Sequence, residues 1–302
     1  MAPALLSCDW GSTHLRAWIL DDEGAVADRR DFLFGVNRLG PGEAERRFYD
    51  DVRPALGAQN LPALLCGAIG SNVGWRTAPY VDCPAALGEI AAAVTGIAED
   101  VWIVPGLRCE GLGAAGDVLR GEETKAMGWL ALDPSAGEGR RLVCQPGTHP
   151  KWLVIEDGRV ARFLSAFTGE LFAVLRAHSI LRGEDTGAEN LATFDEGVAA
   201  AADGDALLNR IYAARSRVAG RGAPRESTGD YLSGLLIGAE VAGTPRLLGL
   251  EGEPVVLLGD RPLCDRYARA LARRGTATTF AEGEPAVRAG LMAIARLRGL
   301  FG

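Results

Sequence analysis

Residues 8–16 read Cys-Asp-Trp-Gly-Ser-Thr-His-Leu-Arg, and this stretch decides the fold. The apolar run that leads into it, residues 4–8, predicts a buried strand. A second apolar run follows at 17–20, and a turn at 22–24 leads to a third run around Val26. The pattern therefore predicts three consecutive strands, with the acid Asp9 at the end of the first.

The turn after the first strand carries groups that suit a phosphate. Backbone N–H groups and hydroxyls of Gly11, Ser12 and Thr13 can donate hydrogen bonds to phosphate oxygens. A carboxylate such as Asp9 can hold the Mg²⁺ that accompanies a phosphate. An ordinary hairpin with polar turn residues is equally compatible with this stretch alone.

A second copy of the opening unit lies half a chain further on. A repeat at nearly half the chain length predicts two domains of one plan. The second turn is then a second candidate phosphate site, with Gln145 near the place of Asp9. Matched residues keep an offset of 134 to 136: Cys8 and Cys144, Gly11 and Gly147, Thr13 and Thr148, His14 and His149, Trp18 and Trp152, Gly24 and Gly158, Val26 and Val160.

The remaining pattern predicts an α/β protein. The 302 residues suffice for two domains, and the Pro/Ser/Gly-rich stretch 133–139 predicts their boundary, giving domains 1–135 and 136–302. Strands followed by alternating helices and strands indicate a mixed sheet covered by helices in each half. Further strands are expected at 63–66, 101–104 and 254–259, and helices at roughly 41–56, 122–132, 169–181, 188–219, 228–243, 263–274 and 284–300.

Composition excludes several classes of protein. A net charge of -7 argues against nucleic acid and anionic membranes as partners. No apolar run approaches the length of a membrane span, and we expect no signal peptide. Six cysteines without a CxxC pair indicate reduced thiols in the cytoplasm, and three scattered histidines argue against a transition-metal site. The GxGxxG at 111–116 does not follow a strand directly, so a dinucleotide site is not expected.

Three further segments carry candidate functional residues. The segment 117–124, Asp-Val-Leu-Arg-Gly-Glu-Glu-Thr, offers three carboxylates, Asp117, Glu122 and Glu123, for a general base or an Mg²⁺-linked acid, although acids at the start of a helix also stabilise its dipole. The Gly-, Pro- and aromatic-rich stretch 70–84 has the composition of a binding loop, or of a structural one. Gly259 and Asp260 end a predicted strand before a helix, where nucleotides often bind.

Taken together, these segments resemble the 2-dehydro-3-deoxygalactonokinases over nearly the whole chain. Two positions depart from the pattern we expect of that family: Asn72 stands where an Arg is expected, and Pro150 where Ser is more frequent. The resemblance rests on the order and spacing of DWGSTHLR at 9–16, GSNVGW at 70–75, APYVDCPA at 78–85, DVLRGEET at 117–124, PGTHPKW at 146–152, TGELFAVLRAHSIL at 168–181 and SGLLIGAE at 233–240.

The resemblance implies two ribonuclease-H-like domains of the actin-like ATPase fold with an interdomain cleft, the first domain on the substrate side and the second binding the nucleotide. It implies transfer of the ATP γ-phosphoryl group to the 6-hydroxyl of 2-dehydro-3-deoxy-D-galactonate, with Mg²⁺ required. The implied roles are Mg²⁺ binding through water by Asp9; γ-phosphate binding by Gly11, Ser12 and Thr13; β-phosphate binding by Gly147 and Thr148; base catalysis by Asp117 or Glu122; adenosine binding by Gly234, Gly238, Gly259 and Asp260; and sugar-acid binding by Ser71, Asn72, Trp75, Arg76 and Tyr80.

Two other activities stay open at this point. An ATPase or exopolyphosphatase-like hydrolase could use the same fold, and so could a non-catalytic actin-like filament protein. The strictness for the galacto over the gluco epimer is also open. The apolar face of the last predicted helix could pack on the chain itself or on a second copy, so a homodimer is a further alternative.

Overall fold

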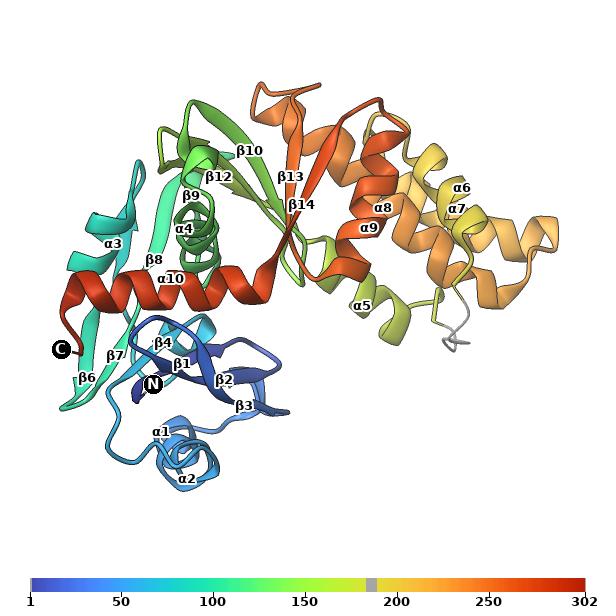
Figure 1. The fold of residues 1–302 in the computed structure, drawn as a ribbon. Coiled ribbons are helices and arrows are strands. Elements are labelled where there is room, and N and C mark those ends of the chain that lie inside the picture. Colours follow the sequence, from blue (N-terminus) through green and yellow to red (C-terminus); the bar gives the residue numbers. More distant parts are fainter. Residues whose placement is uncertain (1, 183–188, 302) are drawn as a thin grey trace. The chain divides into compact units, whose positions relative to one another are not determined.

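The computed structural model describes residues 2–182 and 189–301 (Figure 1). Its first sheet has six strands in the order β3-β2-β1-β4-β7-β6. β1, β2 and β3 form the predicted antiparallel meander, and β4 and β7 extend the sheet in parallel with β1. The bounds are β1 Pro3–Trp10, β2 Leu15–Asp21, β3 Val26–Phe32, β4 Ala63–Cys66, β6 Thr95–Ala98 and β7 Val101–Ile103.

The second sheet repeats the plan of the first. Its order, β12-β11-β10-β13-β14, matches β3-β2-β1-β4-β7 strand for strand. The internal repeat and the prediction of two ribonuclease-H-like domains are therefore confirmed. The bounds are β10 Arg140–Gln145, β11 Lys151–Glu156, β12 Arg159–Ser165, β13 Val255–Gly259 and β14 Thr278–Glu282.

A third, three-stranded sheet was not expected from the sequence. It consists of β5 (Tyr80–Asp82), β8 (Gly106–Gly111) and β9 (Gly113–Leu119), in the order β5-β8-β9. The GxGxxG at 111–116 spans the β8–β9 hairpin, not a strand-to-helix turn, so the exclusion of a dinucleotide site holds. Most of β9 is exposed and poor in large apolar residues, which explains why its pattern gave no strand signal.

The helices fall close to the predicted ranges. The range 188–219 contains two helices, α6 and α7; residue 188 itself lies outside the described residues. The range 41–56 contains α1, a π-turn at Phe48–Val52 and α2. The bounds are α1 Glu43–Arg47, α2 Arg53–Ala55, α3 Leu87–Ala92, α4 Glu122–Leu132, α5 Thr168–His178, α6 Leu191–Ala201, α7 Leu207–Arg221, α8 Thr228–Leu247, α9 Arg261–Ala272 and α10 Gly283–Arg298.

Two compact units emerge from the contacts within the chain. Unit 1 contains the chain up to Arg140, the segment Val154–Arg162 and the chain from Gly283 on; unit 2 contains Arg141–Leu153 and Phe163–Glu282. The sequence predicted a single boundary between the two domains. The chain passes between the units at more than one point, because α10 belongs to unit 1. Among the described residues, no helix is both long and apolar enough to cross a membrane.

Within unit 1, α10 crosses α4 at very short range (Figure 1). A Cβ atom at Gly128 of α4 would lie 1.7 Å from the carbonyl oxygen of Ala286, and one at Gly290 of α10 would lie 2.0 Å from that of Thr124. The two helix backbones are therefore in direct contact. This packing covers the apolar face of α10, for which the sequence allowed packing either on the chain itself or on a second copy.

The crossing predicts a large effect of one methyl group. Gly128→Ala should lower the free energy of unfolding by about 3 kcal/mol or more, because backbone atoms cannot give way as side chains do. The measurement is chemical denaturation. Gly88→Ala in α3 is the matched control: its Cβ would meet nothing within 4 Å, so that variant should be neutral or more stable by up to about 1 kcal/mol. Equal stabilities of Gly128→Ala and the parent protein would contradict the close crossing.

Candidate functional site

The first turn, between β1 and β2, uses the carbonyl groups of Gly11 and Ser12 and the Gly11 N–H, which donates to the His14 oxygen at 2.9 Å, but leaves the next two N–H groups open. The carbonyl oxygens of Gly11 and Ser12 accept hydrogen bonds from the N–H groups of Val36 and Asn37, at 3.1 and 3.0 Å. Within the described chain, the backbone N–H groups of Ser12 and Thr13 donate to no other residue. The turn therefore presents donors, as an anion site requires.

A glycine packs against each of the two repeated turns. A Cβ at Gly35 would lie 2.2 Å from the nitrogen of Thr13, so Gly35 lies against the peptide group joining Ser12 to Thr13. A Cβ at Gly169 would lie 2.4 Å from the Gly147 oxygen in the second turn. These glycines are 134 residues apart, which is the offset of the repeat. This spacing could have identified both glycines from the sequence, but our prediction missed it.

Backbone contacts bring the start of α4 to Asp9. Asp9 is the last residue but one of β1 and lies beside Cys66 of the parallel strand β4. Gly67 follows with φ +93°, and a Cβ there would lie 2.8 Å from the Trp10 oxygen and 3.3 Å from Asp9 Oδ1. Gly121 (φ +105°) precedes α4, and a Cβ there would lie 3.0 Å from the Cα atom of Gly67. Both φ values suit glycine alone. The candidate metal-linked acid and the acidic helix start therefore share one corner of unit 1.

Glu123, the acid of segment 117–124 that was not among the two candidates for the base, is the buried acid of this corner. Its side chain is fully buried; Oε2 accepts from the Gly121 N–H at 2.6 Å and Oε1 from the Thr124 hydroxyl at 2.8 Å. Burial, aided by the charge of Glu122, raises the pKa of Glu123 from 4.5 to about 7. After burial, Asp9 and Glu123 are the main charges that raise the pKa of the Cys66 thiol, which places both acids close to it.

The two acids predicted as candidates for the base are more open. Glu122 is partly buried and its Oε2 accepts from the Arg120 N–H at 3.1 Å. Asp117 lies on β9, opposite Cys109 of β8, and its Oδ1 accepts from the Val118 N–H at 2.7 Å. Glu122 thus lies at the start of α4, next to the contact between Gly121 and Gly67. Asp117 instead lies on β9 of the three-stranded sheet.

Arg120 is a second residue that the sequence analysis passed over, although it stands inside the acidic segment. Its guanidinium lies over the Tyr80 ring at 4.4 Å, and Nη2 donates to the Ala78 oxygen at 2.8 Å. A Cβ at Gly70 would lie 2.9 Å from Nη1. The Nε and Nη1 atoms are buried and have no hydrogen-bond partner. Unused buried donors are costly, and these lie beside the predicted sugar-acid loop.

The predicted sugar-acid residues divide into two groups. Tyr80 contacts Arg120, and Ser71 accepts a hydrogen bond from the Val73 N–H at 3.4 Å. Asn72 and Arg76 are exposed. Trp75 instead packs on Phe48 and Tyr49, with ring centroids 5.3 and 6.0 Å apart, and so anchors the loop to the helical layer. Its contacts within the chain thus account for Trp75 without a ligand.

In unit 2, the second turn lies beside the end of β13. A Cβ at Gly259 would lie 3.7 Å from Pro146 Cδ, next to Gly147. Asp260 follows at the residue before α9. Because β10 and β13 are parallel, their carboxyl ends meet at one edge, where ligands of α/β sheets commonly bind. The structure thus brings Gly147, Gly259 and Asp260 together.

The other two glycines predicted for the adenosine have a packing role. A Cβ at Gly234 would lie 2.0 Å from the Phe194 oxygen, and one at Gly238 would lie 2.9 Å from Ala201 Cβ. Both glycines of α8 therefore face α6 and allow the two helices to touch. The adenosine site proposed below does not include them.

The acids fit Mg²⁺ only in one form. In the described residues, no group of three or more His, Cys, Asp or Glu side chains could enclose a metal ion. Mg²⁺ usually keeps several waters and is bound through one or two carboxylates plus the phosphates of its substrate. Asp9, a single carboxylate beside a turn with open N–H donors, fits a Mg²⁺ ion held by one carboxylate and by the phosphates of the substrate.

The two repeated sheets and their donor-bearing turns define a protein of the actin-like ATPase fold. An activator of 2-hydroxyisocaproyl-CoA dehydratase from Clostridium difficile shares this fold, with a TM-score of 0.51 and 13% identity over 97% of this chain and 95% of its own. Similarity at that level concerns the fold alone.

Comparison with closer relatives shows the family. A family model described as 2-keto-3-deoxy-galactonokinase matches residues 9–294, so this chain belongs to that family. It is 34% identical to the 2-dehydro-3-deoxygalactonokinase of Escherichia coli strain K12 over 98% of both chains. A crystal structure of a Sinorhizobium meliloti protein assigned to the same activity has a TM-score of 0.83 and 34% identity, covering 97% of this chain and 98% of its own. The resemblance seen in the sequence is confirmed.

The buried acid predicts a pH dependence of stability. Because the pKa of Glu123 is raised from 4.5 to about 7, the folded protein keeps a proton that the unfolded chain has already lost. This contribution to stability is complete below pH 4.5, falls between pH 4.5 and 7, and is lost above pH 7. Relative to Glu123→Gln, the parent protein should therefore lose up to about 3 kcal/mol across that range.

Denaturation curves of the two proteins at several pH values between 4.5 and 8 test this. The exposed residue Glu45 provides the control, since Glu45→Gln should keep the parent pH profile. A parent protein and a Glu123→Gln variant with parallel profiles would show that Glu123 titrates as an ordinary acid.

Proposed function

We propose that this chain is an ATP-dependent sugar-acid kinase that phosphorylates the 6-hydroxyl of 2-dehydro-3-deoxy-D-galactonate to give 2-dehydro-3-deoxy-6-phospho-D-galactonate. The observation that carries the proposal is its membership of the 2-keto-3-deoxy-galactonokinase family over residues 9–294. The family and the relative from Escherichia coli are described as kinases, so the alternative of a phosphate-releasing enzyme has no support. The six free cysteines of this chain suit the reducing environment of the cytoplasm.

The phosphate groups of ATP are assigned to the two turns. Ser12 and Thr13, whose N–H groups are unused, would donate to the γ-phosphate, and Gly11, whose N–H donates to the His14 oxygen, would line the same phosphate. Gly147 with Thr148 would donate to the β-phosphate. The edge at Gly259 and Asp260 would take the adenosine. These assignments agree with the predicted roles of the two domains, in which residues 136–302 would bind the nucleotide and residues 1–135 the sugar acid.

Phosphoryl transfer depends mainly on positioning and on neutralising charge. Asp9 would hold Mg²⁺ through water, and the ion would neutralise charge on the phosphate oxygens. The sugar hydroxyl must lose a proton as it attacks, and the acids at the start of α4 are best placed to accept it. Glu123, with a pKa of about 7, joins Glu122 and Asp117 as a candidate, since a base works best when its pKa lies near the working pH.

The sugar acid needs a cation for its carboxylate. Arg120 would supply it, because its Nε and Nη1 atoms lack partners and its guanidinium is fixed by Tyr80 and Ala78. Ser71, Asn72, Arg76 and Tyr80 of the neighbouring loop would complete the contacts. Asn72 cannot provide the charge of the Arg expected there, so Arg120 would carry more of that role.

A substrate assay tests the proposal. Purified protein with ATP and Mg²⁺ should phosphorylate 2-dehydro-3-deoxygalactonate much faster than galactose or gluconate, because galactose lacks the carboxylate that Arg120 would bind and gluconate lacks the 2-oxo group. Including the gluco epimer measures how strictly C4 is recognised. Equal turnover of plain sugars would reject the substrate, and ATP hydrolysis unaffected by any sugar acid would reject the kinase.

Charge-removing variants test the roles of the acids. Asp9→Asn should lower kcat by about 10²-fold or more with unchanged folding, since an amide cannot hold the hydrated ion as a carboxylate does. Among Asp117→Asn, Glu122→Gln and Glu123→Gln, the variant of the base should lose about 10²–10⁴-fold in kcat and also its acidic pH limb. Glu45→Gln is the matched surface control. Full activity of all three variants would mean that no carboxylate acts as the base.

A further inference from the structure

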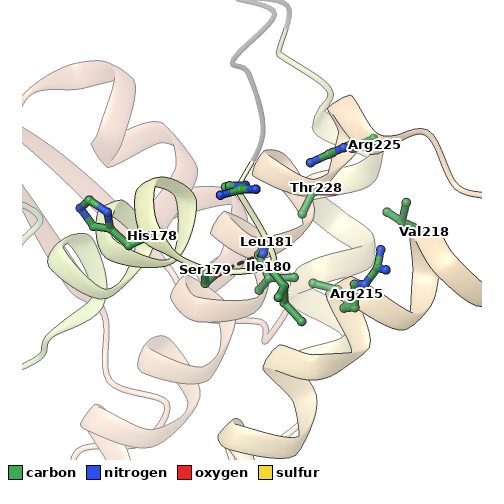
Figure 2. Close-up of a pocket in the computed structure, with 10 residues that line it drawn as sticks. His178, Ser179, Ile180, Leu181, Arg215, Val218, Arg225 and Thr228 are labelled. Carbon is green, nitrogen blue, oxygen red and sulfur yellow. Dashed lines mark hydrogen bonds between the residues drawn. The ribbon is translucent and has the colours of Figure 1, made fainter.

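A cavity in unit 2 lies away from every residue assigned above. Its volume is about 530 Å³, within the range of small-molecule sites. It is lined by the turn after α5, one side of α7 and the start of α8. Figure 2 shows Ile180 and Leu181 at its centre, Arg215 and Val218 from α7 on one side, and Arg225 and Thr228 near the start of α8.

Three arginines at this cavity have no carboxylate partner. Among the described residues, Arg182, Arg215 and Arg225 form no salt bridge. Most other arginines of unit 2 do: Arg217 pairs with Glu196, Arg246 with Asp205, Arg261 with Asp265, Arg266 with Asp230, Arg269 and Arg273 with Asp195, and Arg274 with Asp203. Although the net charge of the chain is -7, these three cations lie at one cavity with no salt bridge to any residue that the structure describes.

A smaller cavity of the same unit shows the contrast. It is lined by Arg273 and Arg274 with Asp203, and both of its arginines are in salt bridges. Like charges around one space repel each other, and low-dielectric walls concentrate their field. The unpaired set is therefore suited to an anion, and the start of α8 adds the positive end of a helix dipole.

The wall of the larger cavity is held in place. Ser179 Oγ donates to the Leu175 oxygen at 2.6 Å and accepts from the Leu181 N–H at 3.0 Å, and Arg176 Nη1 donates to the Leu181 oxygen at 3.2 Å. This turn presents Ile180, 64% exposed, to the solvent. His178 lies on the other side of Ser179 from Arg215 and Arg225, so its imidazole does not belong to the charged wall (Figure 2).

We propose that this cavity binds a small organic anion that carries at least two negative charges and an apolar part, as an organic phosphate does. Arg215 and Arg225 would hold the charged end, since a guanidinium binds phosphate through two parallel hydrogen bonds. Ile180 and Val218 would cover the apolar part. The site is separate from the proposed ATP site, because neither turn and neither Gly259 nor Asp260 lines it.

Isothermal titration with three probes tests the proposal. Phenyl phosphate combines both features, inorganic phosphate lacks the apolar part and benzyl alcohol lacks the charge. Phenyl phosphate should bind at least tenfold more tightly than either of the others. The double variant Arg215→Gln/Arg225→Gln should weaken its binding at least tenfold, while Arg221→Gln, on the same helix but outside the cavity, should not change it.

Two results would overturn the proposal. If the double variant binds phenyl phosphate like the parent protein, the probe occupies another site, including the proposed phosphate turns. If Arg221→Gln weakens binding as much as the double variant, the effect is general charge attraction. Both arginines of the double variant are exposed, so thermal unfolding should show an intact fold, and kinase activity measured alongside separates this site from the proposed function.

Discussion

The candidate site depends on one series of backbone contacts that leaves no room for a side chain. The Trp10 carbonyl lies against Gly67, and Gly67 lies against Gly121, with both glycines at positive φ. This series sets the distance between the end of β1 and the start of α4. Asp9, Glu122 and Glu123 therefore reach one corner through backbone geometry, and any β-carbon at Gly67 or Gly121 would force the strand and the helix apart.

The repeat shows which features belong to the fold and which to the chemistry. Both copies keep a buried tryptophan whose indole N–H donates to a glutamate: Trp18 to Glu284 and Trp152 to Glu240. Both also keep a glycine against the turn, which preserves its donors. The acid is not kept, since β10 ends in buried Gln145 whereas Asp9 is partly exposed. The shared features build the turn, and under the proposed function the unshared carboxylate would give only the first turn a metal-linked role.

The sequence predicted those parts of the fold that rest on long apolar periodicity. The repeated meanders, the central strands β4, β7 and β13 and most helices were found, because buried strands and amphipathic helices leave regular patterns. The third sheet was missed, since its strands are short and β9 is largely exposed. At the site, motif residues such as Asp9, Thr13 and Glu123 could be named, but the burial of Glu123 and Arg120 could not, because it depends on contacts from distant segments. Gly234 and Gly238 were predicted to bind the nucleotide, and the structure adds that both pack against α6.

Two buried glutamates show how the same side chain serves structure in one place and suits chemistry in another. Glu240 accepts from Trp152, Tyr267 and Thr168, so three neutral donors offset much of the cost of burying its charge. Glu123 also accepts from three donors, the Thr124 hydroxyl, the Gly121 N–H and its own N–H, but it lies beside a second acid, Glu122. Burial raises the pKa of both, but Glu240 has its donors fixed around it and is enclosed in the core.

Glu123 lies near Asp9 at the end of a sheet, and a pKa of about 7 lets it gain or lose a proton under ordinary conditions. A helix that needed only an N-terminal acid would be served by Glu122, which is partly exposed. Keeping a second acid buried next to it costs stability above neutral pH, and under the proposed function proton transfer at the site would account for that cost.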